Sequence, residues 1–175
     1  MRHSAILVYP IASVPHCGLF NRWALLSMPA PHKNQIPDET AWRGYEDDLD
    51  ARYMHGLFFG KSIDEVLHLF EGGRAIERSS EMLYAPRPIF QYYIQAFVKF
   101  LMSERAAGES DAASPFLHLL EGREKKDPGS VSNIFASLSK CVDYVASNQV
   151  FFEAEEDIYG NFKAQADVIR KLSGA

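Results

Sequence analysis

The segment Pro88–Arg105 carries an apolar surface too wide for an ordinary surface helix. Its large apolar residues are Ile89, Phe90, Tyr93, Ile94, Phe97, Val98, Phe100 and Leu101. At about 100° per residue these positions cover roughly half of a helix circumference, and Gln95, Lys99 and Ser103 occupy the other side. Because water cannot be excluded from so wide a surface by a single neighbour, the helix must be packed on more than one side. The chain is therefore predicted to fold as a helical core centred on this segment.

The rest of the chain divides by composition into three parts. Residues 4–28 are rich in aliphatic and aromatic residues and predict two short strands, and residues 29–37, with three prolines, predict an extended connector. From residue 38 to 172 the apolar period becomes helical. With 175 residues, 47% of them hydrophobic, one domain with a single core is expected. The predicted fold class is mainly α, at the margin of α+β: a compact bundle of about six helices with a short N-terminal two-strand segment.

Several helix boundaries can be predicted from local signals. Trp42, Tyr45, Leu49 and Tyr53 form one stripe of a helix expected from Asp38 to about His55. A short helix is expected from Ser114-Pro115 to Gly122, after a polar connector over 104–114 and before a solvated turn over 122–129.

The stretch "SIDEVLHLFEGG" (residues 62–73) predicts a helix with clear ends. Ser62 and Glu65 have the spacing of a capping box, and two glycines supply the left-handed C-terminus. Glu65 and His68 also form one Glu-x-x-His pair, which is half of the pattern of di-iron bundles. Such sites need two of these pairs, both pointing inward, whereas here a single pair lies opposite the apolar positions. We interpret it as a solvated pair.

Other sites of chemistry have weak signals. Cys17 and Cys141 lack metal-ligand spacing, no serine-hydrolase elbow occurs, and the histidines form no zinc motif. No cofactor or metal is therefore expected. The net charge of −5 and the scattered basic residues disfavour nucleic-acid binding. The N-terminal apolar run is interrupted by Pro10, and no run reaches the ~20 residues of a membrane span. A cytoplasmic protein without membrane contact is expected.

Two acidic clusters are the most distinctive polar features. The first contains Glu46, Asp47, Asp48 and Asp50, and the second contains Glu153, Glu155, Glu156 and Asp157. Neither has the order of a calcium loop, and the simplest interpretation is a solvated face. The functional interpretation is a negative patch that attracts a protein with a basic surface. Trp42, Tyr45 and Tyr159 would be its aromatic anchors, although Trp42 and Tyr45 also fit the core.

The leading hypothesis is thus a non-catalytic protein-interaction module, such as an adaptor, an inhibitor or a toxin-neutralising protein. The alternative is a small-molecule-binding or enzymatic domain with an aromatic pocket beside the long helix, where Tyr92, Tyr93 and His118 would supply polar contacts. A third possibility is a self-associating subunit in a homo-oligomer.

Overall fold

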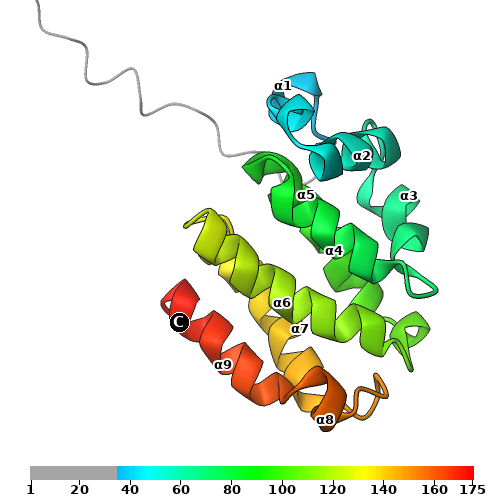
Figure 1. Cartoon of the computed structure of the whole chain (residues 1–175), viewed down its shortest axis with the longest axis vertical. Helices are drawn as coiled ribbons and strands as arrows, with labels where there is room; N and C mark the ends of the chain where they lie inside the picture. Colours follow the sequence, from blue (N-terminus) through cyan, green and yellow to red (C-terminus); the bar gives the residue numbers. More distant parts are fainter. Residues whose placement is uncertain (1–34) are drawn as a thin grey trace, which may run out of the picture. The chain divides into compact units, whose positions relative to one another are not determined.

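The computed structural model describes residues 35–175, which form a helical body without a strand (Figure 1). The α-helices are α1 (Glu39–Trp42), α2 (Leu49–Phe58), α3 (Ile63–Val66), α4 (Ala75–Tyr84), α5 (Arg87–Leu101), α6 (Ser110–Lys126), α7 (Phe135–Ser147), α8 (Glu156–Tyr159) and α9 (Phe162–Ser173). The 3₁₀ turns are η1 (Tyr45–Asp47), η2 (Leu67–Phe70), η3 (Glu104–Ala106) and η4 (Ser132–Ile134). The helical prediction for residues 38–172 is confirmed. The predicted two-strand segment at 4–28 lies outside the described residues, as does most of the connector.

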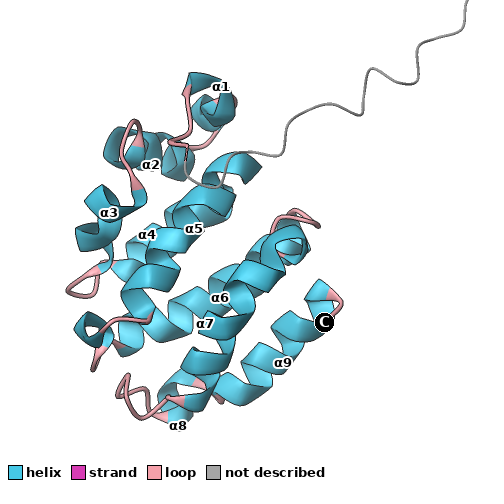
Figure 2. Ribbon diagram, turned by 180° about the vertical axis from the view of Figure 1, so that it is seen from behind, coloured by secondary structure: helices cyan, strands magenta, loops and turns pink. Residues whose placement is uncertain are grey.

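Helix α5 is the centre of the core, as its apolar surface predicts. It packs against α1, α3 and α4 as well as α6 and α7 (Figure 2). The ring of Phe97 lies 4.6 Å from that of Phe70 and 5.3 Å from that of Phe116, measured between centroids. The helix ends at Leu101, earlier than predicted. There Ser103 donates from both its N–H and its hydroxyl to the carbonyl of Phe100, which turns the chain into η3.

The predicted helix over residues 38–55 is wrong, since three shorter elements replace it. Asp38 caps α1 and Asp48 caps α2, each accepting hydrogen bonds from backbone N–H groups. Between them Gly44 has a φ of 92°, which only glycine adopts without strain. The break changes the helical phase, so the face of α2 that is buried consists of Ala51, Met54 and Phe58.

The capping box of residues 62–73 is confirmed. The hydroxyl of Ser62 accepts from the N–H of Glu65, and the Glu65 carboxylate accepts from the Ser62 N–H at 2.8 Å. The element is shorter than predicted, because α3 passes into η2 after Val66. Glu65 and His68 are both exposed, as the interpretation of a solvated pair requires.

The predicted short helix at 114–122 is in fact the middle of the 17-residue α6. Its first turns were expected to be a polar connector, but Ala112 and Ala113 are fully buried. Their small side chains let α6 approach its neighbours closely, and α6 packs mainly on α4 and α9. Gly122 does not end the helix. A Cβ there would lie 3.5 Å from the Leu83 side chain, which is an ordinary van der Waals distance.

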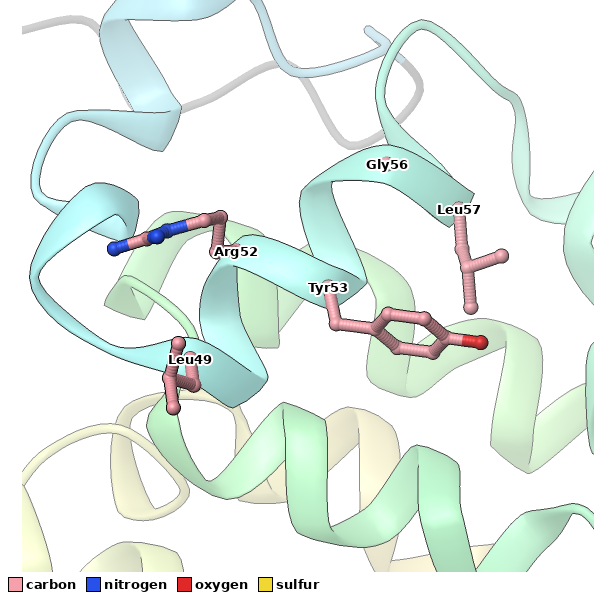
Figure 3. Close-up of a pocket in the computed structure, with 5 residues that line it drawn as sticks. All are labelled: Leu49, Arg52, Tyr53, Gly56 and Leu57. Atoms are coloured by element: carbon pink, nitrogen blue, oxygen red, sulfur yellow. The ribbon is translucent and has the colours of Figure 1, made fainter.

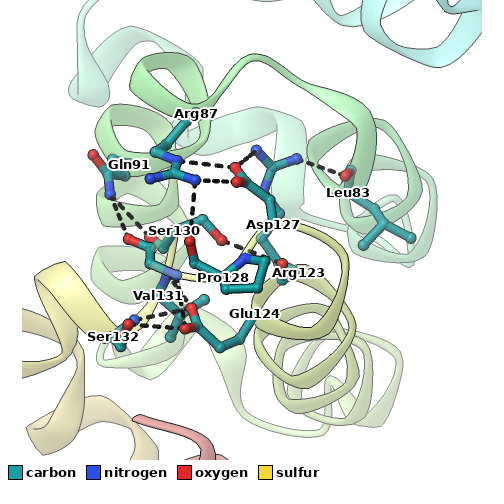
Figure 4. A network of polar contacts seen from close by, with 11 residues as sticks. Leu83, Arg87, Gln91, Arg123, Glu124, Asp127, Pro128, Ser130, Val131 and Ser132 are labelled. Carbon is teal, nitrogen blue, oxygen red and sulfur yellow. Dashed lines mark hydrogen bonds and ion pairs between the residues drawn. The ribbon is translucent and has the colours of Figure 1, made fainter.

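The solvated turn predicted at 122–129 is wrong in part: residues 122–126 belong to α6, and although Lys125, Lys126 and Pro128 are exposed, Arg123 is buried in an ionic network (Figure 4). Arg123 is 3% exposed and donates to the Leu83 carbonyl at 2.7 Å and to the Asp127 carboxylate at 3.0 Å. Arg87 forms an ion pair with the same carboxylate from the start of α5. These two arginines hold the pKa of Asp127 below its ordinary value: the Arg87 hydrogen bond is the main cause. The network joins the ends of α4, α5 and α6.

Glu124 organises the beginning of the next segment. Its carboxylate accepts from the N–H groups of Gly129, Val131 and Ser132 and from the Ser132 hydroxyl, at 2.8 to 3.1 Å. Burial opposes ionisation of this group, but the four donors outweigh burial and hold the pKa of Glu124 below its ordinary value. The carboxylate therefore acts as a cap for the chain entering η4 and α7.

The variant Glu124→Gln is expected to lower the free energy of unfolding by about 2 kcal/mol at pH 7, because an amide cannot accept all four bonds. Since the pKa is lowered in the folded state, the contribution of Glu124 is present above its unfolded pKa of about 4.3 and is lost as the pH falls through the folded value. Denaturant titrations at pH 7 and pH 3 measure the difference. Asp157→Asn, at an exposed carboxylate, is the control. An equal loss at both pH values would contradict this account.

Candidate functional site

The two acidic clusters do not combine into one surface. Figures 1 and 2 place η1 and α2, which carry the first cluster, at the opposite end of the helical body from α8, which carries part of the second. Each cluster therefore has its own set of neighbouring side chains.

In the first cluster one carboxylate has a structural role. Asp48 accepts from the N–H groups of Asp50 and Ala51 at 2.9 and 3.1 Å, as the N-cap of α2. Glu46, Asp47 and Asp50 are exposed. These three are thus available to another molecule.

The second cluster surrounds a loop and a single-turn helix. Its four members, Glu153, Glu155, Glu156 and Asp157, are all exposed. The predicted anchor Tyr159 is held by the fold: its hydroxyl accepts from Ser110 and donates to Asp111, both at 3.0 Å. The two grooves described below are lined by residues of α2 and α4 and do not include this cluster.

The exposed apolar side chains near the first cluster are not the aromatic residues that the sequence suggested as anchors. Trp42 is fully buried, in agreement with its alternative interpretation as core. Tyr45 is half-buried and stacks on His55, with 3.9 Å between the ring centroids. The exposed apolar side chains near the first cluster are instead Leu49 (76% exposed), Tyr53 (59%) and Ile76 (46%). Sequence reasoning missed them because it assigned Leu49 and Tyr53 to a buried stripe.

Two shallow grooves meet at Tyr53. One, of about 500 Å³, is lined by Leu49, Arg52, Tyr53, Gly56 and Leu57 (Figure 3). The other, of about 410 Å³, lies between α2 and α4 and is lined by Asp50, Tyr53, Ile76, Glu77, Ser80 and Glu81. Figure 3 shows Tyr53 and Leu57 projecting on the same side of α2, while Arg52 extends toward η1. We call the lining residues of both grooves together the α2–α4 face.

A buried ion pair lies at the second groove, which its glutamate lines. Arg78 and Glu81 lie one turn apart on α4, with 2.8 Å between Nη2 and Oε1, and their side chains are 4% and 6% exposed. Arg78 also pairs with Glu77 at 3.0 Å and lies 5.6 Å from the centroid of the Tyr53 ring. The three-residue spacing of Arg78 and Glu81 in the sequence is compatible with this ion pair, but the spacing does not indicate that the pair is buried.

This ion pair is incompletely satisfied. Among the described residues, neither Oε2 of Glu81 nor Nε of Arg78 has a hydrogen-bond partner. Burial raises the pKa of Glu81 to about 7, although the nearby Arg78 acts in the opposite direction. Glu77 and Asp50 add to the rise by repulsion. A buried carboxylate with an unpartnered oxygen therefore lines the groove between α2 and α4.

The residues of the alternative pocket do not line either groove. The Tyr93 hydroxyl is buried and donates to the carbonyls of Phe58 and Lys61, so it ties α5 to the end of α2. Tyr92 is half-buried beside it, and its pKa is raised mainly by burial. His118 is exposed on α6, with Nδ1 3.0 Å from the Ser114 carbonyl. These contacts provide no support for a pocket beside α5.

Cys141 is 1% exposed, and burial raises the pKa of its thiol to about 12, so it is a core residue. Within residues 35–175 no cluster of three or more histidine, cysteine or acidic side chains has the geometry to hold a metal ion. No helix of this region is long and apolar enough to cross a membrane. Cys17 lies outside the described residues.

Comparison with known proteins adds little to this geometry. No family model matches the chain, and no solved structure matches it. A curated protein, dopamine receptor 3 of Caenorhabditis briggsae, is 26% identical over 83 residues, which is 44% of this chain and 14% of the receptor. The match thus spans about one seventh of the receptor's length, and it does not show a family.

The pKa of Glu81 can be measured directly. Carboxyl ¹³C resonances of the labelled protein, followed from pH 4 to pH 9, are expected to show Glu81 titrating near 7. A raised folded pKa means that Glu81 favours folding below its unfolded pKa, and this contribution is lost as the pH rises through 7. The stability of the wild type should accordingly fall by an amount on the order of 2 kcal/mol between pH 5 and pH 8, relative to Glu81→Gln. A Glu81 titration near 4 would contradict the assignment.

Proposed function

We propose that this protein is a non-catalytic interaction module that binds a basic segment of another protein on the α2–α4 face. The observation that carries the proposal is the gathering of exposed apolar side chains around two adjoining grooves, one of which is also lined by three carboxylates.

The apolar part of the face supplies the contact area. Leu49, Tyr53 and Ile76 together bring two aliphatic side chains and one aromatic ring to neighbouring helices. Binding energy is usually concentrated in a few such residues, and tyrosine is enriched among them. Tyr53 borders both grooves, so it is the central anchor.

The charges of the face favour a basic partner. Asp50, Glu77 and Glu81 line the groove between α2 and α4. Arg78 pairs with two of these carboxylates, and Arg52 donates to the Glu46 carbonyl at 2.7 Å, so the three carboxylates and the two arginines together carry a net charge of −1 when all are ionised. Lysine or arginine side chains of a partner would therefore meet an excess of negative charge, which raises both association rate and specificity.

The proposal predicts which peptides the face selects. A random peptide library displayed on phage and panned against the full chain should yield sequences in which lysine or arginine alternates with apolar residues. The double variant Tyr53→Ser/Ile76→Ser should lose at least about tenfold in affinity for them, because truncation of central anchors costs more than 1 kcal/mol each.

Matched control variants distinguish specific binding at this face from nonspecific binding to apolar or acidic surface. Val168→Ser/Leu172→Ser removes two apolar side chains of α9 that are 41% and 38% exposed, and it should leave binding unchanged. Asp47→Lys/Asp50→Lys should weaken binding, whereas Glu155→Lys/Asp157→Lys at the far end should not. If the α9 pair or the far acidic pair matters equally, or if the selected peptides carry no basic residues, the proposal is wrong.

A further inference from the structure

The groove between α2 and α4 contains more negative charge than its own cation can balance. Arg78 is one guanidinium shared by Glu77 and Glu81, and Asp50 is the third carboxylate of the groove lining. With all three carboxylates ionised the local charge is −2. Burial is the main cause that opposes the ionisation of Glu81, and repulsion from Glu77 and Asp50 adds to it. A second cation in this groove would remove the imbalance.

The geometry also leaves a hydrogen-bond acceptor for such a cation. Oε1 of Glu81 is bound by Arg78 at 2.8 Å, whereas Oε2 has no donor in the described part of the chain. An unmatched buried acceptor costs free energy, and a charged donor is the partner that recovers most of it. Tyr53 and Ile76 form the apolar wall above, and both project at the surface, where they have room to move aside.

We infer that the α2–α4 groove is a subsite for one lysine or arginine side chain of the bound protein, with its head group on Glu81 Oε2. The inference rests on the proposed function, and it names the residue that selects the partner. The alkyl stem lies along Tyr53 and Ile76, as long basic side chains commonly cover apolar surface. Asp50 faces the head group from the rim. Glu81 is thus a specificity-determining residue.

Occupation of the subsite must be linked to the ionisation of Glu81, because only the carboxylate form attracts the cation. The groups that face Glu81 are Arg78 and Glu77 from α4 and Asp50 and Tyr53 from α2. The histidine of α2, His55, contacts Trp42, Tyr45 and Phe59 instead.

On α6, the other main neighbour of α4, the buried charges of Arg123 and Glu124 are engaged in the network of Figure 4. Glu81 is therefore the group in this groove whose charge changes between pH 6 and pH 8.

The test uses n-butylguanidinium chloride as a probe of the subsite, with the full chain, at constant ionic strength. This cation does not titrate near neutral pH. Amide NMR shifts should saturate and should identify residues of α2 and α4, and n-butyramide, which is neutral, should not produce them. Glu81→Gln should raise the dissociation constant of the probe about tenfold, which is the loss expected when one charge-assisted hydrogen bond is removed. Glu77→Gln, at an exposed carboxylate, should change it less than about threefold.

The wild type provides a second readout that does not depend on the folding of a variant. Because Glu81 has a pKa of about 7, binding of the probe should strengthen about five- to tenfold from pH 6 to pH 8. A flat pH profile, shifts scattered over the exposed acidic residues, or unchanged binding to a folded Glu81→Gln variant would each overturn the inference.

Different results would contradict the proposed interaction function and the proposed cation subsite. If library peptides bind the α2–α4 face equally well after Glu81→Gln, the interaction function stands and the subsite is wrong. If the probe binds through Glu81 but the library yields no peptide for this face, the cation site stands and the interaction function is wrong.

Discussion

The apolar surface of α5 is the constraint on which the rest of the described fold depends. Eight of its fifteen residues are buried, including three phenylalanines and a tyrosine, and removing so much area from water is the main favourable term in folding. No single partner can cover them, so helices from both sides pack on α5. The Arg87–Asp127–Arg123 network then fixes the turn after α6 against the start of α5. Hydrophobic burial gathers the helices, and the ionic contacts fix how the chain enters and leaves them.

Two buried glutamates, Glu124 and Glu81, have pKa values that are shifted in opposite directions. Glu124 and Glu81 are 7% and 4% exposed. Glu124 receives four hydrogen bonds, most of them from backbone N–H groups that have fixed positions, and its pKa falls. Glu81 receives an ion pair at one oxygen only and lies near two further carboxylates, and its pKa rises. The first arrangement is complete within the fold. The second is strained electrostatically and borders a groove, which is the combination expected where another molecule completes the contacts.

Sequence patterns predicted the parts of this protein that depend on local rules. The wide face of α5, the capping box of Ser62 and Glu65, and the helical period over 38–172 all follow from residue spacing, and all are confirmed. Six of the helices within 35–175 have ten residues or more, close to the predicted number. The errors arose where tertiary contacts decide. Asp48 begins a new helix inside the segment 38–55, and within the polar run "GREKK" Arg123 and Glu124 are buried because they find hydrogen-bond partners in the fold. Leu49 and Tyr53 were assigned to one apolar stripe because the sequence pattern did not reveal the change of helical phase before α2.

The central claim is that contacts with a basic partner concentrate on the α2–α4 face. The most direct measurement is an amide hydrogen-exchange map of the full chain, with and without a bound basic peptide, at peptide concentrations that saturate the protein. The account predicts slower exchange over α2 and α4, with α8 and α9 unchanged. Protection confined to α8 or α9, or spread evenly over the exposed acidic residues, would contradict it.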